Sequence, residues 1–432
     1  MKNKADLLIL NGRIATLRGF SDKPQRGSDF GRLGLTDGAL AIQGDKILAV
    51  GPLEQVSRQV ELSSARIIDA GGRLVAPGLI DPHTHVVHCG SREMEYGMRL
   101  AGTPYIEILK AGGGILNSVR QVRQASVAEM VAQTKKSLRR MLAYGVTTVE
   151  SKSGYGLDTD SEVKMLRAME ILNHIQPVDL VPTFMGAHAI PEEYKDDSDE
   201  FVRIIIEDML PRVKELAVFC DVFCEEHVFS IEQTRRIFKA ARGHGLGLKL
   251  HADELAPTGG AQLAAEMGAV SADHLLCVDS DGITALAKSD TIAVLLPGTS
   301  FNLMSNYAPA REMLEAGVAI ALSTDYNPGS CPTENLQLIM TLGCLKLGLS
   351  PSQVLAAVTI NAAHALKRAD SIGSLEEGKQ ADLVIFDADN EAYLPYHFGI
   401  NHTWLVVKSG KVAFKKHEED YCEDRYPNCS GS

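Results

Sequence analysis

Two histidines separated by a single residue stand in the stretch GLIDPHTHVVHCG, which begins at Gly78. The apolar run RLVAPGLI before them predicts a buried strand, and residues two apart in a strand point to the same face. His83 and His85 are therefore predicted to face one interior space, about 7 Å apart along the backbone. Two imidazoles placed in this way can bind one metal ion, although a His-x-His pair alone is about as often structural.

Further candidate ligands follow later predicted strands. The stretch HADE offers His251, and STDYN offers the carboxylate of Asp325, which could instead cap a turn. Three histidines and a carboxylate, with one position left to water, are typical of a hydrolytic Zn²⁺ or Fe²⁺ site. A metal ion held there would lower the pKa of a water molecule to about 7.

Two more side chains suit proton transfer. Glu254 follows His251 by three residues, near enough to move protons without binding the metal. His274 ends another predicted strand, where it could polarise a substrate carbonyl or hold the attacking water. Taken alone, His274 or His188 would more often be a hydrogen-bonded core residue. The joint pattern favours a site, because His-x-His, His-x-x-Glu, His and Asp each end a predicted strand.

The elements that must position these residues are predicted to alternate between strand and helix. Eight apolar runs end at or near the candidate residues, and helices are predicted between several of them. One helix is expected over 126–144, from a Ser126/Glu129 capping box to Gly145. Eight such strands, apolar on both faces, indicate a closed (β/α)₈ barrel of the TIM type, in which catalytic residues lie at the carboxyl ends of the strands.

The two ends of the chain have a different texture. Short β-rich runs, with turn signals at Asn11-Gly12 and Gly44-Asp45, fill the beginning, and similar runs return after residue 380. We therefore predict a small β-sandwich domain made from both ends, a barrel between them and a disordered charged tail. The corresponding ranges are 1–77 with 371–415, then 78–370, and finally 416–432.

Composition argues against several classes of protein. The 432 residues carry a formal charge of −12, and no cluster of lysine and arginine marks a nucleic-acid surface. No apolar run reaches the roughly 20 residues that span a bilayer, and no secretory signal is recognisable, so we expect a cytoplasmic protein without a membrane partner. The eight cysteines form no CxxC pair, which favours reduced thiols.

The stretches LIDPHTH, HADE, ADH and STDYNPGS resemble the amidohydrolases that bind one metal ion. The longer stretches AGTPYIEILKAGGGI, ESKSGYGLDTDSEVKMLR and GAHAIPEEY resemble one family of these enzymes, the imidazolonepropionases, and the likeness extends over residues 5–412. This resemblance implies a small-molecule substrate, 4-imidazolone-5-propanoate, whose cyclic amide is hydrolysed to N-formimidoyl-L-glutamate in histidine degradation. It also implies one Zn²⁺ or Fe²⁺/Fe³⁺ ion per chain, and because barrels of this kind are commonly dimers, we expect a homodimer.

The resemblance further implies a role for each candidate residue. The metal ligands would be His83, His85, His251 and Asp325. Proton transfer and the carbonyl group would be served by Glu254, His274 and Asp325. The substrate, chiefly its propionate, would be held by Arg92, Tyr105, Tyr155 and His188. Glu254 would also contact it, and Asn327, Gly329 and Ser330 would contact the substrate or the product.

Related enzymes with two metal ions bridge them through a carbamylated lysine, and Lys152 is a candidate for that role. We instead expect Lys152 to pair with a carboxylate such as Glu150, because four ligands already complete the site. Two other functions stay open. An aminohydrolase acting on a nucleobase would use the same ligands, but Arg92 and Tyr155 suit a carboxylate tail that nucleobases lack. A non-catalytic assembly subunit would have lost the ligands, which this chain retains.

Overall fold

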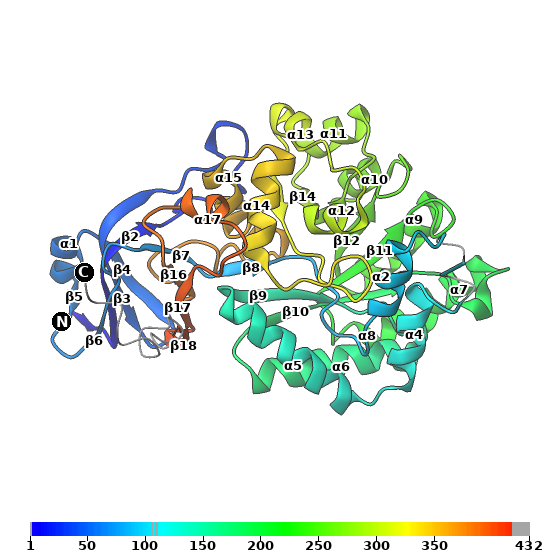
Figure 1. The fold of residues 1–432 in the computed structure, drawn as a ribbon, viewed down its shortest axis with the longest axis horizontal. Helices are drawn as coiled ribbons and strands as arrows, with labels where there is room; N and C mark the ends of the chain where they lie inside the picture. Colours follow the sequence, from blue (N-terminus) through cyan, green and yellow to red (C-terminus); the bar gives the residue numbers. More distant parts are fainter. Residues whose placement is uncertain (1, 105–106, 109–110, 417–432) are drawn as a thin grey trace, which may run out of the picture.

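The computed structural model describes residues 2–104, 107–108 and 111–416. It consists of a barrel of parallel strands surrounded by helices and a smaller curved sheet made from both ends of the chain (Figure 1). Apart from Lys416, the predicted tail lies outside the described residues, and so does Tyr105. Among the helices in the described part of the chain, none is long and apolar enough to cross a membrane.

The barrel sheet contains eight parallel strands that neighbour one another in sequence order. They are β8 (Leu79–Asp81), β9 (Val146–Lys152), β10 (Asp179–Ala187), β11 (Phe219–Cys224), β12 (Gly247–Ala252), β13 (Ser271–His274), β14 (Ile292–Leu295) and β15 (Ile320–Leu322). A parallel bridge between Thr84 and Tyr326 joins the segments after β8 and β15, so the barrel closes just beyond the strand ends. The predicted barrel is confirmed, with each strand where an apolar run predicted it.

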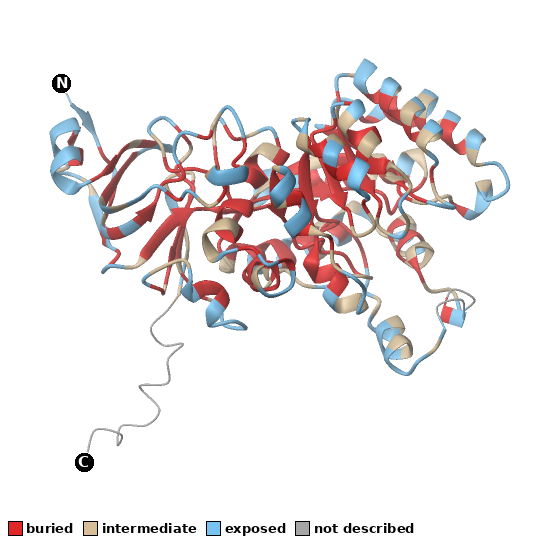
Figure 2. Ribbon diagram, turned by 90° about the horizontal axis from the view of Figure 1, so that it is seen from above, coloured by how far each residue is buried: buried red, intermediate tan, exposed pale blue. Residues whose placement is uncertain are grey.

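Helices cover the outside of the barrel and leave its strands buried on both faces (Figure 2). The helices of this part of the chain are α2 (Glu93–Leu100), α4 (Ile115–Gln124), α5 (Val127–Ala143), α6 (Thr159–Ile175), α7 (Ser198–Ile204), α8 (Leu210–Val213), α9 (Ile231–Gly243), α10 (Gly260–Glu266), α11 (Ser280–Ala287), α12 (Pro297–Leu303), α13 (Ala310–Ala316), α14 (Leu336–Leu347), α15 (Pro351–Ala357) and α16 (Ile360–Ala365). The predicted helix is confirmed as α5, with a Ser126/Glu129 capping box and Gly145 at a φ of 90° after its end.

The seam between the first and last strands is held by a buried carboxylate. Asp81, at the end of β8, accepts hydrogen bonds from the hydroxyl of Ser323 and from Thr324, whose hydroxyl and N–H lie 2.6 Å and 2.9 Å away. The N–H of Asp325 donates to the carbonyl of His83 at 3.1 Å. The closure of the barrel therefore brings two of the predicted metal ligands together from opposite ends of its sequence.

The smaller sheet has the order β18-β17-β16-β7-β2-β3-β4, with β6 paired to β2. Its strands are β2 (Leu7–Ala15), β3 (Leu35–Gln43), β4 (Lys46–Gly51), β6 (Arg66–Asp69), β7 (Leu74–Pro77), β16 (Leu383–Phe386), β17 (Thr403–Lys408) and β18 (Lys411–Lys415). Strand β1 (Asn3–Lys4) pairs separately with β5 (Val60–Glu61). Helix α1 (Leu53–Gln59) precedes the barrel in the chain, and α17 (Tyr393–Tyr396) follows it. The sheet is curved so that Ile42 and Ile47 share one core with Ile385 and Leu405. The predicted β domain of both chain ends thus takes the form of one sheet whose ends pack together.

Two local predictions are wrong. Asn11-Gly12 does not form a turn, because β2 continues through both residues; Asn11 has a φ of 53° and the pairing of β2 with β3 shifts register there, which is a β-bulge. The run RLVAPGLI is not one strand either, since β7 and β8 belong to different sheets. They separate at Gly78, where an added Cβ would lie 2.3 Å from the hydroxyl oxygen of Thr147. Gly44-Asp45, in contrast, does join β3 to β4.

Candidate active site

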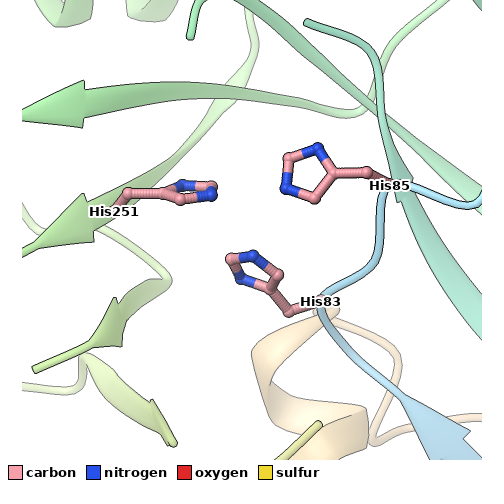
Figure 3. A group of neighbouring side chains, drawn as sticks. All are labelled: His83, His85 and His251. Carbon is pink, nitrogen blue, oxygen red and sulfur yellow. The ribbon is translucent and has the colours of Figure 1, made fainter. Parts of the chain in front are cut away.

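Three histidine side chains converge at the carboxyl end of the barrel (Figure 3). One ring nitrogen from each of His83, His85 and His251 lies within 4.8 Å of the others. The first two were expected within a strand, but β8 ends at Asp81 and they lie in the segment that follows. That segment still pairs with the one after β15, so it is extended and both imidazoles reach the same space.

Asp325 adds a carboxylate to this group. Its Oδ1 lies 3.5 Å from Nε2 of His83 and 3.8 Å from Nε2 of His85. Ligand atoms of a tetrahedral zinc ion, each about 2.0–2.2 Å from the metal, lie roughly 3.3–3.6 Å apart, so the group has the dimensions of a metal site. Asp325 has a φ of 53°, a left-handed conformation that is uncommon outside glycine and is frequent at functional sites.

Several histidine nitrogens in this space lack a hydrogen-bond partner among the described residues. Nε2 of His83, Nε2 of His251 and Nδ1 of His85 are buried without one. Burial lowers the pKa of His83 and His85 well below its usual value, so both rings are neutral and have a lone pair to donate. A bound metal ion would satisfy Nε2 of His83 and Nε2 of His251, while His85 faces Asp325 with its Nε2, and the donor set therefore fits one.

Two of these imidazole rings, those of His83 and His251, also contact a buried carboxylate through the nitrogen that faces away from the metal position. Nδ1 of His83 lies 2.6 Å from Oδ2 of Asp273, and Nδ1 of His251 lies 2.9 Å from Oδ1 of Asp221. Because an ionised carboxylate only accepts, each Nδ1 carries the proton and each Nε2 is left to bind a metal. Both aspartates were missed from the sequence, where a charged residue inside the apolar strands FCDVFC and SADH was the available signal.

Lys152 lies beneath these carboxylates and is fully buried. Its Nζ is 2.6 Å from Asp221, 3.0 Å from Glu150 and 3.4 Å from Asp273. Burial alone would lower the pKa of Lys152, but the three carboxylates outweigh it and hold this pKa above its usual value. The lysine is therefore an ammonium group in an ion-pair network, and the prediction that it pairs with Glu150 is confirmed.

A second group with ligand spacing lies beside the first and consists of His83, Glu150 and Asp273. Its carboxylates already have cationic partners. Lys152 and Lys249 lie 3.0 Å and 2.8 Å from the two oxygens of Glu150, and both lysines are fully buried. The two ammonium groups thus supply the positive charge that a second metal ion would bring.

Glu254 and His274 lie next to the three histidines, with Oε1 of the first 3.5 Å from Nδ1 of the second. Burial, reinforced by the nearby Asp325, raises the pKa of Glu254 to about 8. Burial also lowers the pKa of His274 well below its usual value. A carboxyl group that exchanges its proton near neutral pH, beside a neutral imidazole, has the properties of a general acid–base catalyst.

The backbone of Glu254 is fixed by a residue to which no role was given from the sequence. The buried carboxylate of Glu225 accepts hydrogen bonds from the N–H groups of Glu254 at 3.0 Å and Leu255 at 2.8 Å. These bonds fix the backbone of the turn after β12 and therefore the position from which the Glu254 side chain extends.

A cavity of about 530 Å³ opens above these groups. Its lining includes every predicted substrate contact within the described residues, namely Arg92, Tyr155, His188, Glu254, Asn327, Gly329 and Ser330. The remaining predicted contact, Tyr105, lies outside the described residues. Apolar residues, among them Ile115, Phe223 and Leu303, complete the wall. A volume in this range is typical of sites that bind small molecules.

Arg92 reaches the cavity from the N-terminal end of α2. Its Nε and Nη2 lie 2.9 Å and 2.8 Å from Oε2 of Glu95. Its other edge packs against Gly329, where an added Cβ would lie 2.2 Å from Nη1. Glycine is therefore required at position 329 for the guanidinium to lie against this wall.

His188 stacks on His85, with ring centroids 4.8 Å apart and an angle of 15° between the planes. Its Nδ1 donates to the carbonyl of Gly154 at 3.0 Å, which leaves Nε2 as an acceptor. Burial lowers the pKa of His188 to about 3, so the ring is neutral. Tyr155 lies beside both rings, 5.6 Å from His85 and 5.3 Å from His188 between centroids.

The side chain of Asn327 is used entirely within its own loop. Its Nδ2 donates to the carbonyl of Asp325 at 2.7 Å and to Oγ of Ser330 at 2.8 Å. Its Oδ1 accepts from the N–H groups of Gly329 and Ser330 at 2.8 Å and 2.7 Å. An amide side chain has two donors and two acceptor sites, so any contact between Asn327 and a ligand would come from its backbone.

Comparisons with known proteins agree with this geometry. Residues 74–413 match the family model described as the amidohydrolase family. The imidazolonepropionase of Alkaliphilus oremlandii is 55% identical over 399 residues, which cover 91% of this chain and 94% of that protein. The chain belongs to the amidohydrolase family, within the imidazolonepropionases. A second imidazolonepropionase, from Fusobacterium nucleatum, is 53% identical over 416 residues and is covered along 100% of its length.

Solved structures with this amidohydrolase fold are more distant in sequence. The 5-methylcytosine deaminase from Klebsiella pneumoniae superposes with a TM-score of 0.71 at 18% identity, over 95% of this chain and 98% of that one. An adenosine deaminase from Xanthomonas campestris with bound zinc gives a TM-score of 0.66 at 18% identity. At this level the likeness concerns the fold alone. Amidohydrolases are metal-dependent enzymes, and this one has a donor group that could bind a metal ion.

Proposed function

We propose that this enzyme hydrolyses 4-imidazolone-5-propanoate to N-formimidoyl-L-glutamate, a step of histidine degradation. Relatives that are 53–55% identical over nearly the whole chain bear the name imidazolonepropionase, which supports this assignment. The observation that carries it is that one cavity is lined by His85, His251 and Asp325 of the donor group and by Arg92. The first suits hydrolysis of an amide, and the second suits a substrate with a carboxylate tail.

His83, His85, His251 and Asp325 would hold one metal ion per chain, either zinc or iron, because imidazole and carboxylate ligands suit both. When bound, the ion supplies Lewis acidity, which lowers the pKa of water and polarises a carbonyl oxygen. The carboxylates of Asp221 and Asp273 keep the ligand rings of His251 and His83 in the tautomer that this role needs.

Proton transfer falls to Glu254. Its carboxylate form takes a proton from the attacking water, whose oxygen bonds to the carbonyl carbon of the ring. The bond between that carbon and the ring nitrogen then breaks, and Glu254 returns the proton to the leaving nitrogen. With a pKa near 8, Glu254 is suited to both directions at neutral pH. His274, beside it, stabilises the negative charge that develops on the carbonyl oxygen.

Arg92 orients the substrate by binding its propionate, while Tyr155 and His188 enclose the ring near His85. The loop that includes Gly329 and Ser330 contacts the substrate or the opened product. Within this loop, we assign Asn327 chiefly to holding the loop in shape, since its amide hydrogen bonds are all internal.

The decisive experiment follows the ultraviolet absorbance of 4-imidazolone-5-propanoate with purified protein, together with elemental analysis of the same sample. We expect loss of absorbance, formation of N-formimidoyl-L-glutamate and a bound transition metal. The same preparation should release no ammonia from cytosine or guanine, because neither offers a carboxylate to Arg92. Ammonia release without imidazolone hydrolysis would instead establish the aminohydrolase alternative, and absence of both metal and activity would establish a non-catalytic protein.

The expected homodimer and the expected cytoplasmic location stay predictions. Size-exclusion chromatography with light scattering measures the first directly: a mass of twice the 46.7 kDa chain is expected, and a mass of one chain would contradict it.

A further inference from the structure

Arg99 lines the same cavity as Arg92 and had no role assigned from the sequence. Arg92 caps the start of α2, and Arg99 lies in the last turn of this helix. Residues seven apart in a helix are separated by nearly two full turns, so they return to the same face. The helix therefore presents two arginines toward one cavity.

The two arginines differ in their partners. Arg92 is paired with Glu95, whose carboxylate is held in place by the N–H of Gly114 and the Nδ2 of Asn117, both at 3.0 Å. The Arg92–Glu95 pair therefore contributes little net charge to the cavity. For Arg99, the described part of the chain offers no carboxylate within 4.0 Å, so its positive charge is uncompensated.

The guanidinium of Arg99 also has unused hydrogen-bonding capacity. Its Nε is buried and lacks a partner among the described residues. Its Nη2 donates to the carbonyl of Asn302 at 3.4 Å, a long bond, and its Cζ lies 5.3 Å from the ring centroid of Tyr96. A buried N–H group without a partner is costly, and an anionic ligand in the cavity would remove that cost.

We propose that Arg99 is a second carboxylate-recognising residue, which binds the propionate of the substrate together with Arg92. This proposal rests on the proposed function and deepens it, because it names the group that gives the cavity its preference for an anion. Arg92 offers a fixed, already paired guanidinium that orients the carboxylate. Arg99 supplies the positive charge that the Arg92–Glu95 pair does not.

A purely structural role for Arg99 makes a different prediction. Through Asn302, Arg99 contacts α12, and Nδ2 of Asn302 donates to the carbonyl of Ser330 at 2.7 Å. If Arg99 only held these segments together, its loss would disturb every ligand of the cavity to a similar extent. If Arg99 recognises a carboxylate, its substitution should instead weaken the binding of charged ligands and leave the binding of neutral ligands nearly unchanged.

The test compares binding of imidazole-4-propanoate and of its primary amide, each measured by calorimetry on the metal-loaded enzyme. Arg99→Gln retains an N–H donor for the Asn302 carbonyl but removes the charge, and Arg99→Lys restores the charge without the planar fork. Arg139→Gln, at an exposed position of α5, is the control with the same change in net charge.

We expect Arg99→Gln to weaken binding of the acid by about tenfold to a hundredfold, the usual effect of losing a charge-assisted hydrogen bond, and to change binding of the amide by less than about threefold. Arg99→Lys should lie between wild type and Arg99→Gln, and Arg139→Gln should match wild type. Metal content and thermal melting of each variant establish that it is folded.

An unchanged ratio of acid to amide affinity in Arg99→Gln, whether both ligands bind normally or both bind weakly, overturns the proposal. If Arg99→Gln does not fold, the ratio of acid to amide affinity in Arg99→Lys decides it instead: a ratio below that of wild type supports the proposal, and an unchanged ratio overturns it. Failure of the wild type to hydrolyse 4-imidazolone-5-propanoate would refute the proposed function separately, because the affinity ratio requires no turnover.

Discussion

Oδ2 of Asp273 lies 2.6 Å from Nδ1 of His83, on the opposite side of the imidazole from the Nε2 that lies 3.5 Å from Asp325. The aspartate thereby sets the tautomer of a metal ligand without touching the metal position. Asp273 also forms an ion pair with Lys152, 3.4 Å away. The same lysine pairs with Asp221, the aspartate that contacts His251. The ligand rings therefore depend on one buried network of charges.

Asp273→Asn should weaken metal binding while leaving the ligands in place. The amide can still accept from Nδ1 of His83, but it removes the negative charge that makes the ring a stronger donor. Losses of this kind cost about 10- to 100-fold in metal affinity. Competition with a chelator measures the effect, and Asp281→Asn, at an exposed position of α11, is the matched control. Equal metal affinity in wild type and Asp273→Asn would contradict this role.

Metal stoichiometry should be about one ion per chain, because the two lysines occupy the second group of possible ligands. Lys152→Met should then lower stability rather than remove a second ion. It leaves Asp221 and Asp273 without their shared cation, and breaking a buried ion pair costs about 3–5 kcal/mol. Urea denaturation measures the stability, and elemental analysis measures the metal. Two tightly bound ions in wild type, with one lost in Lys152→Met, would show that the one-metal assignment is wrong.

Glu254→Gln should separate metal binding from catalysis. The amide keeps the shape of the side chain but cannot carry a proton between water and the leaving nitrogen. We expect normal metal content and a fall in kcat of about 100-fold or more, the range for loss of a general acid–base group. Elemental analysis and single-turnover kinetics check the two parts independently. Loss of the metal in this variant would move Glu254 into the group of ligands.

The raised pKa of Glu254 also predicts how stability depends on pH in the metal-free protein. Its pKa is 4.5 without the influence of the fold and about 8 within it, so the folded chain holds a proton that the unfolded chain has released. Stability therefore falls as pH rises through this interval, by at most about 1.4 kcal/mol per pH unit for one proton.

Between about pH 7 and 8 His251 acts in the same direction, because burial alone would lower its pKa but Asp221 outweighs burial and raises it; the comparison with Glu254→Gln therefore isolates the contribution of Glu254. Burial lowers the pKa of His83, His85 and His274, so their contribution to stability increases with pH but is complete once the unfolded histidines are neutral, above about pH 7. Burial raises the pKa of Asp81 and Asp325 only to about 6. Urea denaturation across this window should show the stability of wild type falling relative to that of Glu254→Gln as pH rises, because the amide has no proton to release. Parallel curves would contradict the raised pKa.

The sequence was sufficient to predict the barrel and to identify candidate ligands that lie close together, because His83, His251 and Asp325 each lie at or just beyond the end of an apolar strand, and that order is local information. The residues behind the ligands depend on long-range pairing. The register of β12 with β13 sets Asp273 level with His251, and the register of β11 with β12 sets Asp221 level with Lys249. No single strand encodes such a register. Arg99 was missed for a similar reason, since its importance depends on where α2 lies over the barrel.

Arg92 and Gly329 form a pair whose substitutions should not be additive. A Cβ at Gly329 would lie 2.2 Å from Nη1 of Arg92, so Gly329→Ala must displace the guanidinium. We expect Gly329→Ala to raise KM for 4-imidazolone-5-propanoate, and Arg92→Met to lower kcat/KM by about 100-fold as the propionate loses its partner. In the Arg92→Met background, the added methyl group should have little further effect, because the side chain that it displaces is no longer charged.

The substrate itself provides the decisive comparison for Arg92. Lysine cannot reproduce the planar fork that binds a carboxylate through paired hydrogen bonds, so Arg92→Lys should already reduce kcat/KM, with metal content unchanged in every Arg92 variant. An analogue with its carboxylate converted to an amide should be a poor substrate for wild type, and Arg92→Met should lose little more on it. If Arg92→Met impaired both substrates equally, or neither, Arg92 would not bind the propionate. The preference for an imidazolone acid over a nucleobase would then need another structural basis.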